Sequence, residues 1–513
     1  MSRIENTSRN ILWGVLNNVI SIVMPFFVKT SIIYVIGVEY VGIDGLFTSV
    51  LQVLSFAELG IGTALIYSMY KPIAQGDDAR VCALMNFYKK SYAVIGGIVL
   101  VIGLGILPFL GIIINKDLPQ GINIYYLYLI YLLNNVVSYL AYPECTSLMI
   151  ACQRIDLKSK MALVIKVILS ISQITAIILF ENYYIYCMLI PVFTFLQNYL
   201  SMVIVRREFP IYRCRGELPS TEVIAIKNNV KGLVYQRLGG VISASADTMV
   251  ISSFLGIKVL GIYQTHLYVI TALFNFLYVI TNAIIPSSGN KVANETKEKN
   301  YDDFKKFHFI YTWIVAWCSV LILVLFEKIM ILWMGENFIL SHDMFILFAV
   351  YFFIYRWLDM IYVYKEASGI WWQGRWIPLL AAILNLTLNI ILVGKIGLYG
   401  ILLSTIISVV VIHDTLGVNV VRRHYFGHCM NMPKFYLKQL YIITTTFIAG
   451  VIAYYVCSAV KINIFFDVLV CFLICLILPN LILYCFWRKL PEYVEAKSFA
   501  VDFYVKLKER ILG

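Results

Sequence analysis

Charged residues are scarce in this sequence. Asp, Glu, Lys and Arg make up 14% of its 513 residues, whereas apolar residues make up 61%. Soluble domains carry about a quarter of their residues as charged side chains, so this composition excludes a soluble globular protein. Long hydrophilic stretches are absent as well, which leaves no room for a separate soluble catalytic domain. We therefore expect an all-α polytopic membrane protein that is not an enzyme.

The sequence also lacks the cysteine and histidine patterns that hold disulfides or metals. Of its 11 cysteines, several lie inside apolar runs and none is paired in a loop expected outside the membrane. Cys471 and Cys475 share a helix face, but no histidine or carboxylate lies beside them, which favours small apolar core residues over a metal site. We expect no disulfide, no metal, no catalytic residue and no cofactor.

No cleavable targeting signal precedes the first apolar run. The short basic N-terminus leads directly into an apolar stretch that is too long for a signal peptide, so we expect an uncleaved first span. The net charge of +12 does not indicate nucleic-acid binding, because the basic residues fall mainly in short loops between apolar runs. In that position they report the topology of a membrane protein.

About fourteen apolar stretches are long enough to cross a bilayer, which takes roughly 20 residues in a helix. They cover residues 11–36, 46–67, 92–114, 125–149, 161–180, 183–205, 233–255, 259–285, 309–333, 344–364, 376–393, 398–420, 441–460 and 468–486. Basic residues gather in every second loop, starting with the loop after the second span, and the intervening loops hold one basic residue or none. This alternation predicts that both termini are cytoplasmic.

Glycine-bounded turns indicate an internal duplication. Residues 37–43 read GVEYVGI between the first two spans, and residues 256–262 read GIKVLGI between the seventh and eighth. A third version occupies residues 394–400. We infer that spans one to six and seven to twelve are two copies of one unit, inserted the same way up because six is even. The alternative is that tight turns between helices simply favour glycine.

The duplication divides the chain into two lobes with additions. We predict an N-terminal six-helix lobe, a cytoplasmic linker, a C-terminal six-helix lobe, two further spans and an amphipathic cytoplasmic tail. Their boundaries are 1–206, 207–232, 233–423, 424–490 and 491–513. The tail alternates apolar and basic residues, as expected for a helix that lies along lipid headgroups.

Ionisable and amide side chains inside the apolar spans are the candidate functional residues. A charge at the centre of a bilayer costs about 2.5 to 3.5 kcal/mol on insertion scales, so such a group faces a partner or a wet cavity. The candidates for a cavity wall or substrate site are Asn17, Asn18, Lys29, Glu58, Arg237, Asp247, Arg356 and Asp359.

Two of these candidates have clear alternatives. Lys29 follows Pro25, whose missing N–H favours a bend in the first helix, and it either faces a cavity or extends to the outer headgroups. Glu58 lies too deep to reach the headgroups, so it faces a cavity or accepts a hydrogen bond between helices. The repeat places Asp247 at the depth of Lys29, where the two side chains could pair.

The remaining polar residues of the spans admit simpler interpretations. Arg356 and Asp359 are three residues apart on one helix and can neutralise each other. Lys166 is shallow enough to reach cytoplasmic phosphates. Hydrogen bonding between helices accounts for the others, which are Asn385, Asn389, His413 and Asp414.

Five segments together carry a resemblance to a known family. They are residues 39–74, which begin EYVGIDGLF, with ALMNFYKKSY at 83–92, LLNNVVSYLAYPE at 132–144, ASADTMVISSFLGIKVLGIY at 244–263 and LNLTLNIILVGKIGLYGILLSTIIS at 384–408. With them the sequence resembles bacterial polysaccharide biosynthesis proteins of the oligosaccharide-flippase type. That group belongs to the multidrug/oligosaccharidyl-lipid/polysaccharide exporter (MOP) superfamily.

This resemblance implies two six-helix lobes around a central cavity, with two extra C-terminal helices, in the bacterial inner membrane. It implies movement of undecaprenyl-pyrophosphate-linked oligosaccharides to the outer leaflet by alternating access, for O-antigen or capsule synthesis. The implied partners are the lipid-linked oligosaccharide, membrane lipids, and a polysaccharide polymerase with its chain-length machinery. A coupling proton or sodium ion is left open. Acidic residues rival basic ones in the spans, which departs from a strongly cationic cavity.

The sequence leaves two alternatives to a flippase. A cation-coupled drug or metabolite exporter of the same fold would need an unpaired carboxylate in a cavity without basic neighbours. A membrane polymerase or acyltransferase would be expected to carry a long outer loop with paired arginines or histidines. Every outer loop of this sequence is short and nearly uncharged, which disfavours the enzyme.

Overall fold

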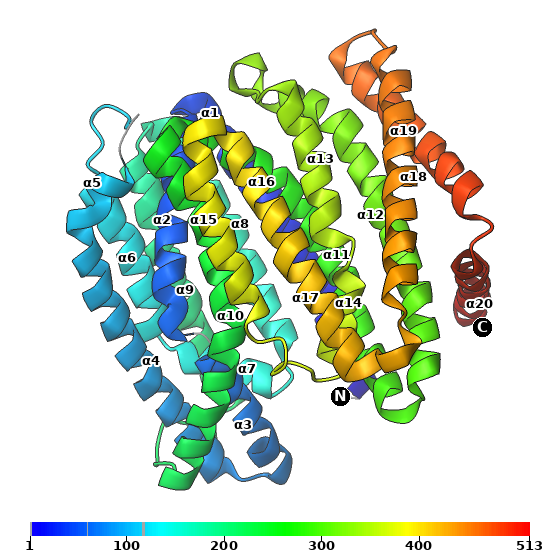
Figure 1. The fold of residues 1–513 in the computed structure, drawn as a ribbon. Coiled ribbons are helices and arrows are strands. Elements are labelled where there is room, and N and C mark those ends of the chain that lie inside the picture. Colours follow the sequence, from blue (N-terminus) through cyan, green and yellow to red (C-terminus); the bar gives the residue numbers. More distant parts are fainter. Residues whose placement is uncertain (1–2, 59, 115–117, 513) are drawn as a thin grey trace. The chain divides into compact units, whose positions relative to one another are not determined.

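A computed structural model describes residues 3–512 of the chain, apart from residue 59 and residues 115–117 (Figure 1). Helices and short helical turns form its regular structure, and no strand occurs in these described ranges. The described chain forms two compact units, Met1–Thr265 and His266–Gly513, which divide within the long helix α11. The all-α class predicted from composition is therefore confirmed.

The first unit contains the helices up to the start of α11. They are α1 (Arg3–Val35), α2 (Val38–Leu54), η1 (Ser55–Glu58), α3 (Ile61–Gln75), α4 (Asp78–Ile106), η2 (Leu107–Phe109), α5 (Leu110–Ile113), α6 (Ile124–Leu140), α7 (Pro143–Ala151), α8 (Ile155–Phe180), α9 (Tyr183–Glu208) and α10 (Ser220–Leu255). Asparagine caps two of these helices: Asn123 accepts from the N–H of Tyr125, and Asn182 accepts from the N–H of Tyr184. Helix α1 packs along α8, and α10 packs against α2.

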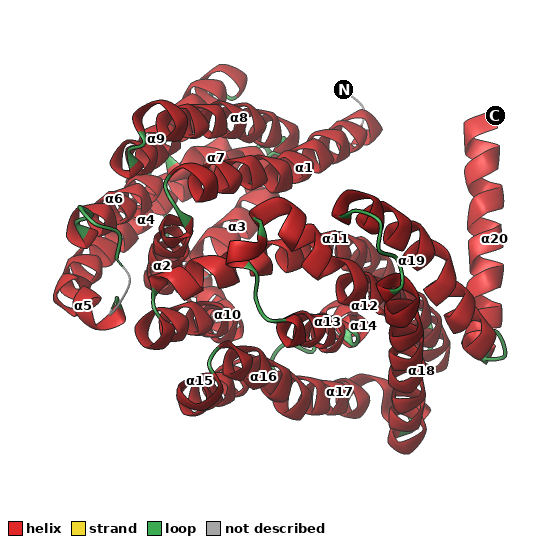
Figure 2. Cartoon of the chain, turned by 90° about the horizontal axis from the view of Figure 1, so that it is seen from above, coloured by secondary structure: helices red, strands yellow, loops and turns green. Residues whose placement is uncertain are grey.

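The second unit contains the helices from α11 (Ile257–Asn294) onward. They are α12 (Lys297–Met334), η3 (Glu336–Phe338), α13 (His342–Arg356), α14 (Asp359–Ala367), α15 (Ile377–Ile396), α16 (Leu398–Ser408), η4 (Val409–Asp414), α17 (Thr415–Val421), η5 (Arg422–Phe426), η6 (Gly427–Cys429), α18 (Met432–Ser458), α19 (Ile464–Trp487) and α20 (Pro491–Leu512). Seen end-on, α15 lies beside α16 and α17 follows (Figure 2).

Twelve of the described helices are long and apolar enough to cross a membrane, and thirteen if the bent pair α6 and α7 counts as one span. The chain is thus a multi-pass membrane protein. Several expected spans are not continuous helices. Within residues 46–67, for example, α2 ends at Leu54 and α3 begins at Ile61. Gly60 precedes α3 with a φ of +91°, a backbone conformation that glycine adopts without strain.

The repeated turns are shorter than the sequence pattern predicted. Gly37 alone reverses the chain, with a φ of +119°, and Val38 already begins α2. Gly256 plays the same part before Ile257, with a φ of +94°. Most of each glycine-bounded segment is therefore the first part of a helix, because a single residue in this conformation suffices to change the direction of the chain.

Helix α12 lies at the centre of the second unit. It packs against α13, α18, α19 and α20, and its apolar stretch is the most buried of the candidate spans. The expected pair of additional spans is formed by α18 and α19, which lie side by side (Figure 1). Cys457, Cys471 and Cys475 sit there in an apolar cluster with Val320 and Val324. All 11 cysteines are free thiols.

The predicted linker, residues 207–232, packs against α4 within the first unit. Asn86 of α4 donates its amide N–H to the carbonyl of Gly216 at 2.8 Å, and Arg80 pairs with Glu222 at 2.9 Å. The thiol of Cys214 lies 3.6 Å from a carboxylate oxygen of Glu144. Burial and the nearby Glu144 charge raise the pKa of Cys214 to about 12, so this thiol stays protonated at neutral pH.

Candidate functional site

The starts of α2 and α11 cross at a pair of glycines. A Cβ added to Gly42 would lie 2.2 Å from the carbonyl oxygen of Ile257, and one added to Gly261 would lie 2.1 Å from the carbonyl oxygen of Val38. Both distances are far below van der Waals contact, so only glycine fits at either position. Gly42 and Gly261 are equivalent residues of the two glycine-bounded segments, and each contact recurs with its partners exchanged.

The same exchange symmetry extends to charged residues. Glu39 and Lys258 each stand two positions after the glycine that begins their segment, and their side chains form an ion pair at 3.6 Å. Val38 and Ile257, one position earlier, are both fully buried. Reciprocal contacts between equivalent residues are what an internal duplication predicts, and a general preference for glycine in turns does not explain them.

A cavity of about 160 Å³, lined by both apolar and charged residues, lies among α1, α2, α8 and α9. We call it the lysine pocket; its charged lining residues are Lys29, Lys166 and Asp44. Lys166 donates to the hydroxyl oxygen of Ser21 at 3.0 Å. The sequence left Lys29 with two possible environments and predicted that Lys166 reaches the cytoplasmic phosphates. In the structure both lysines line one cavity within the spans.

Asp44 ties the lysine pocket to a network of tyrosines. Its Oδ1 accepts a hydrogen bond from the hydroxyl of Tyr131 at 2.5 Å, and that hydroxyl lies 3.3 Å from the hydroxyl of Tyr183. Tyr183 in turn donates to the carbonyl of Tyr40 at 3.1 Å. Sequence reasoning missed Asp44 because the expected second span began only after it. Since α2 begins at Val38, Asp44 lies in its second turn and faces the neighbouring helices.

Glu58 lies at the break between α2 and α3. The hydroxyl of Tyr92 donates to its Oε1 at 2.8 Å, and the rings of Tyr88 and Tyr92 stack with their centroids 4.3 Å apart. Gly62 makes room for this arrangement, since a Cβ there would meet the Tyr92 hydroxyl at 2.5 Å. In this conformation Glu58 makes the hydrogen bond between helices that was one of its two predicted environments.

A second interruption carries charge in the other unit. Helix α13 ends at Arg356 and α14 begins at Asp359, and Nη1 of Arg356 lies 3.3 Å from Oδ2 of Asp359. The hydroxyl of Tyr311 donates to the same oxygen at 2.5 Å, and the guanidinium lies 4.1 Å above the ring of Phe274. The predicted pairing of Arg356 with Asp359 is therefore present. Among the described residues Nε of Arg356 is buried without a hydrogen-bond partner.

The neighbouring π-helix η4 brings Asp414 to the same region. Its Oδ2 accepts a hydrogen bond from the indole N–H of Trp357 at 2.9 Å, at the interruption between α13 and α14. Tyr362 stacks on His413 at 4.2 Å and donates to its carbonyl at 2.6 Å. Short π-helical turns and interrupted spans both occur frequently at functional sites of membrane proteins. This region is thus a candidate ion site.

Other predicted residues fall in varied surroundings. Asn385 donates to the Thr405 hydroxyl at 3.0 Å, which is the predicted bond between helices. Asn17 is half-buried and Asn18 is exposed. The side chain of Arg237 lies outside the described residues. Asp247 is half-buried, and its pairing with Lys29 stays a prediction.

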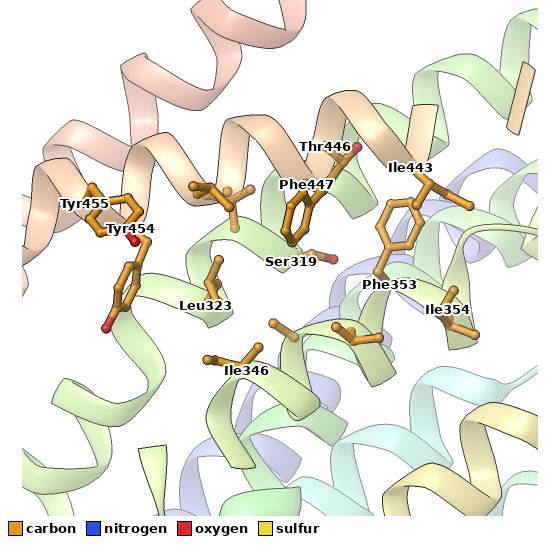
Figure 3. A pocket seen from close by; sticks show the side chains of 15 residues that line it. Ser319, Leu323, Ile346, Phe353, Ile354, Ile443, Thr446, Phe447, Tyr454 and Tyr455 are labelled. Carbon is orange, nitrogen blue, oxygen red and sulfur yellow. The ribbon is translucent and has the colours of Figure 1, made fainter. Parts of the chain in front are cut away.

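An apolar pocket of about 380 Å³ opens between α12, α13 and α18 (Figure 3). Phe447 of α18 and Phe353 of α13 line it, with Leu323 and Ile346 further along and Tyr454 near one end (Figure 3). Its surface is almost entirely apolar. Sequence reasoning had no signal for this pocket, because apolar residues that line a groove look the same in sequence as those that face lipid.

Three side chains of the second unit offer metal-ligand atoms close together. Oε1 of Glu298 lies 3.6 Å from the thiol of Cys429 and 3.9 Å from Nε2 of His428. Glu298 and His428 are exposed and Cys429 is half-buried. Because surface groups of this kind commonly gather without an ion, we assign no metal to them.

Comparison with solved structures identifies proteins with a similar fold. No family model and no curated protein sequence matches the chain. Among solved structures, the lipid II flippase MurJ in an inward closed conformation superposes with a TM-score of 0.67 at 15% identity, covering 94% of this chain and 99% of MurJ. An inward-facing multidrug resistance MATE transporter of the MOP superfamily gives 0.59 at 14% identity, covering 78% and 94%. A point mutant of the MATE transporter VcmN of Vibrio cholerae gives 0.54 at 13% identity, covering 82% and 98%. The chain thus has the fold of MOP-superfamily transporters.

Proposed function

We propose that this chain, with its MOP-superfamily fold, is a flippase for undecaprenyl-pyrophosphate-linked oligosaccharides. It moves them from the cytoplasmic to the outer leaflet of the bacterial inner membrane by alternating access. The translocated units then enter surface polysaccharide such as O antigen or capsule. The observation that carries this proposal is the presence of two lysines in one pocket within the spans.

The charge of the lysine pocket favours an anionic substrate. Lys29 and Lys166 supply two ammonium groups against the single carboxylate of Asp44. A pocket lined by two lysines and one aspartate carries surplus positive charge, which favours an anion over a cation as its occupant. A pyrophosphate offers several charged oxygens to two lysines at once.

The apolar pocket favours a substrate with a lipid chain. It lies within the membrane-spanning part of the second unit, and its lining is made of side chains such as Leu323, Ile346 and Phe353. A groove of this composition can hold part of an isoprenoid chain but offers no counter-charge to a cationic drug. The substrate is therefore amphipathic, with an anionic headgroup and an apolar tail.

The crossing at Gly42 and Gly261 supplies the moving joint of the mechanism. The loop charges predict that these turns lie at the outer side of the membrane. Passage of a headgroup to that side requires the two segments to separate, which breaks the Glu39–Lys258 ion pair and exposes two glycine surfaces. The half-exposed ion pair adds little to the cost of opening, which comes mainly from exposing the buried side chains of Val38 and Ile257.

The second candidate is a cation-coupled exporter of the same fold. Asp44 is a carboxylate within a span, where it can take up a proton or sodium ion. It shares its pocket with Lys29 and Lys166, however, whereas such an exporter needs a carboxylate without basic neighbours. Coupling of this kind is also compatible with a flippase. An enzyme is the least favoured function, since the structural neighbours are transporters and flippases.

The decisive experiment compares lysine variants in a host whose surface polysaccharide depends on this chain. The double variant Lys29→Gln with Lys166→Gln is expected to lower surface polysaccharide at least tenfold and to accumulate lipid-linked oligosaccharide in the inner leaflet. The exposed Lys71→Gln variant, at equal abundance in the membrane, is the control. Full polysaccharide export by the double variant would reject the lysine pocket as the headgroup site, on which the proposal depends. Loss of organic-cation efflux with unchanged polysaccharide would favour the exporter.

The proposed partners follow from the same pathway. A polysaccharide polymerase and its chain-length machinery use the translocated units, so we expect both to be retrieved with the chain after crosslinking in intact cells. Retrieval of neither from a strain that makes the polysaccharide would remove them as partners and leave the flippase itself unaffected.

A further inference from the structure

The loop between α14 and α15 exposes three tryptophans. Residues 368–376, the tryptophan loop, read SGIWWQGRW. Trp371, Trp372 and Trp376 are 52%, 63% and 46% exposed, although tryptophan is on average a well-buried residue. Exposed indoles at the end of a membrane span are typical of the headgroup level. The tryptophan loop is therefore expected at the depth where lipid phosphates lie.

An arginine is held between two of these indoles. The guanidinium of Arg375 lies 3.9 Å from the ring centroid of Trp372 and 5.6 Å from that of Trp376. Its Nη1 donates to the carbonyl of Trp372 at 2.7 Å. A guanidinium has five N–H donors, so most of them remain for water or a ligand. The stacking fixes a flat cationic group at the surface of the tryptophan loop.

A buried lysine lies directly beneath the tryptophan loop. Lys365, in the last turn of α14, is only 5% exposed. Its Nζ lies against Gly374, where an added Cβ would approach to 2.9 Å, and 5.7 Å above the ring centroid of Tyr362. The neighbouring carboxylate of Glu366 accepts the indole N–H of Trp371 at 2.8 Å. In the part of the chain that the structure describes, Lys365 forms no ion pair with a carboxylate.

This burial is unusual for lysine. Lysine is almost never fully buried unless it is paired, because an ammonium without a counterion loses its hydration and gains nothing in return. The face of Tyr362 compensates only part of that loss. Lys365 thus has the surroundings of a group that awaits an anion, next to the exposed guanidinium of Arg375.

We propose that Lys365, Arg375 and the exposed indoles form a binding site for the pyrophosphate of a lipid-linked sugar, at the side where the substrate enters. The inference rests on the proposed function and adds an entry site to it. Lys365 pairs with one phosphate from below, Arg375 donates to the other at the surface, and a sugar ring packs on the free face of Trp372. The absence of a side chain at Gly374 keeps the ammonium close to the loop.

Interfacial anchoring is the competing explanation for the tryptophan loop. Anchoring accounts for exposed indoles and for Arg375, but it does not require a buried ammonium. The two explanations differ in the ligand-free protein. A buried ammonium that is only partly compensated destabilises the fold, so Lys365→Met is expected to raise the thermal unfolding midpoint. A structural lysine would give the opposite sign.

Binding is tested with the full chain in phosphatidylcholine nanodiscs, by tryptophan fluorescence. Undecaprenyl pyrophosphate in the nanodisc is expected to quench the emission, and the Trp372→Phe variant is expected to lose much of that change. Lys365→Gln should weaken the apparent affinity about ten- to a hundredfold, as expected for loss of a charged hydrogen bond. Lys365→Arg should retain most of it. Lys461→Gln, an exposed lysine in another loop, is the matched control.

Two further ligands separate the sources of the anion. Inorganic pyrophosphate tests the headgroup alone and should compete with the lipid, whereas phosphatidylglycerol at equal charge should not. Equal quenching by phosphatidylglycerol, or unchanged binding with a lowered unfolding midpoint in the Lys365 variants, would overturn the entry site. If those variants bind normally while the Lys29 and Lys166 double variant still abolishes export, the entry site fails and the flippase stands. If the wild-type chain does not respond to undecaprenyl pyrophosphate at all, both fail.

Discussion

The hydroxyl of Tyr92 donates a hydrogen bond to Glu58 at the point where the second expected span is interrupted. The bond joins α4 to the short turn η1, and the stacked ring of Tyr88 fixes the donor in place. A carboxylate satisfied in this way within a membrane protein stabilises the interruption, because the alternative is an unsatisfied polar group in an apolar environment.

A double-mutant cycle tests this bond. Tyr92→Phe and Glu58→Gln should each lower thermal stability, and the double variant should lose less than the sum. We expect a coupling of about 1.5 to 3 kcal/mol, the range for a hydrogen bond to a charged group. The measurement is thermal unfolding of the purified chain in one detergent. Strictly additive losses would mean that Glu58 is satisfied by cavity water and not by Tyr92.

Alanine normally stabilises a helix relative to glycine, but at Gly42, where α2 crosses α11, it should destabilise the protein. Gly42→Ala places a methyl group against the carbonyl of Ile257, and overpacking of this kind costs about 1 to 3 kcal/mol. Gly97→Ala in α4 is the control, since its Cβ meets nothing within 4 Å and alanine is intrinsically favoured there by about 1 kcal/mol. Unfolding midpoints should therefore move in opposite directions. Equal shifts would show that the two segments do not touch.

Locking the repeated turns together should stop transport. A short dithiol-reactive crosslinker between cysteines at Glu39→Cys and Lys258→Cys is expected to abolish polysaccharide export reversibly, because their side chains are in contact only while the segments are closed. Each single variant treated with the same reagent controls for the native thiols. Export that continues with the crosslink verified on a gel would contradict alternating access through this joint.

Removing one partner of the ion pair at the second interruption should destabilise the fold more than removing both partners. Asp359→Asn leaves the guanidinium of Arg356 without its counter-charge. Losing one partner of a fully buried pair costs about 3 to 5 kcal/mol, and this pair is partly buried, so we expect a loss below that range. The double variant with Arg356→Gln removes both charges and should recover much of that loss. Thermal unfolding of the three variants measures this. A double variant as unstable as Asp359→Asn would show that the pair is not the source of the stability.

The sequence predicted the fold class and most spans because these depend on composition and on patterns along the chain. It did not predict where polar side chains meet. Lys166 and Lys29 are far apart in sequence, and only the packing of α1 on α8 brings them to one pocket. Asp44 was passed over because the helix start was placed too late. The break at Glu58 was hidden by the uniformly apolar run around it.

The reciprocal contact between Gly42 and Gly261 has an evolutionary consequence. A surface that touches its own equivalent is self-complementary, as in a twofold-symmetric homodimer. A single six-helix precursor could therefore have assembled in parallel pairs through this same joint, and gene fusion would have preserved it without any new interface. Each half would afterwards have been free to diverge, one towards Glu39 and the other towards Lys258, so that a contact between identical chains became a contact between opposite charges.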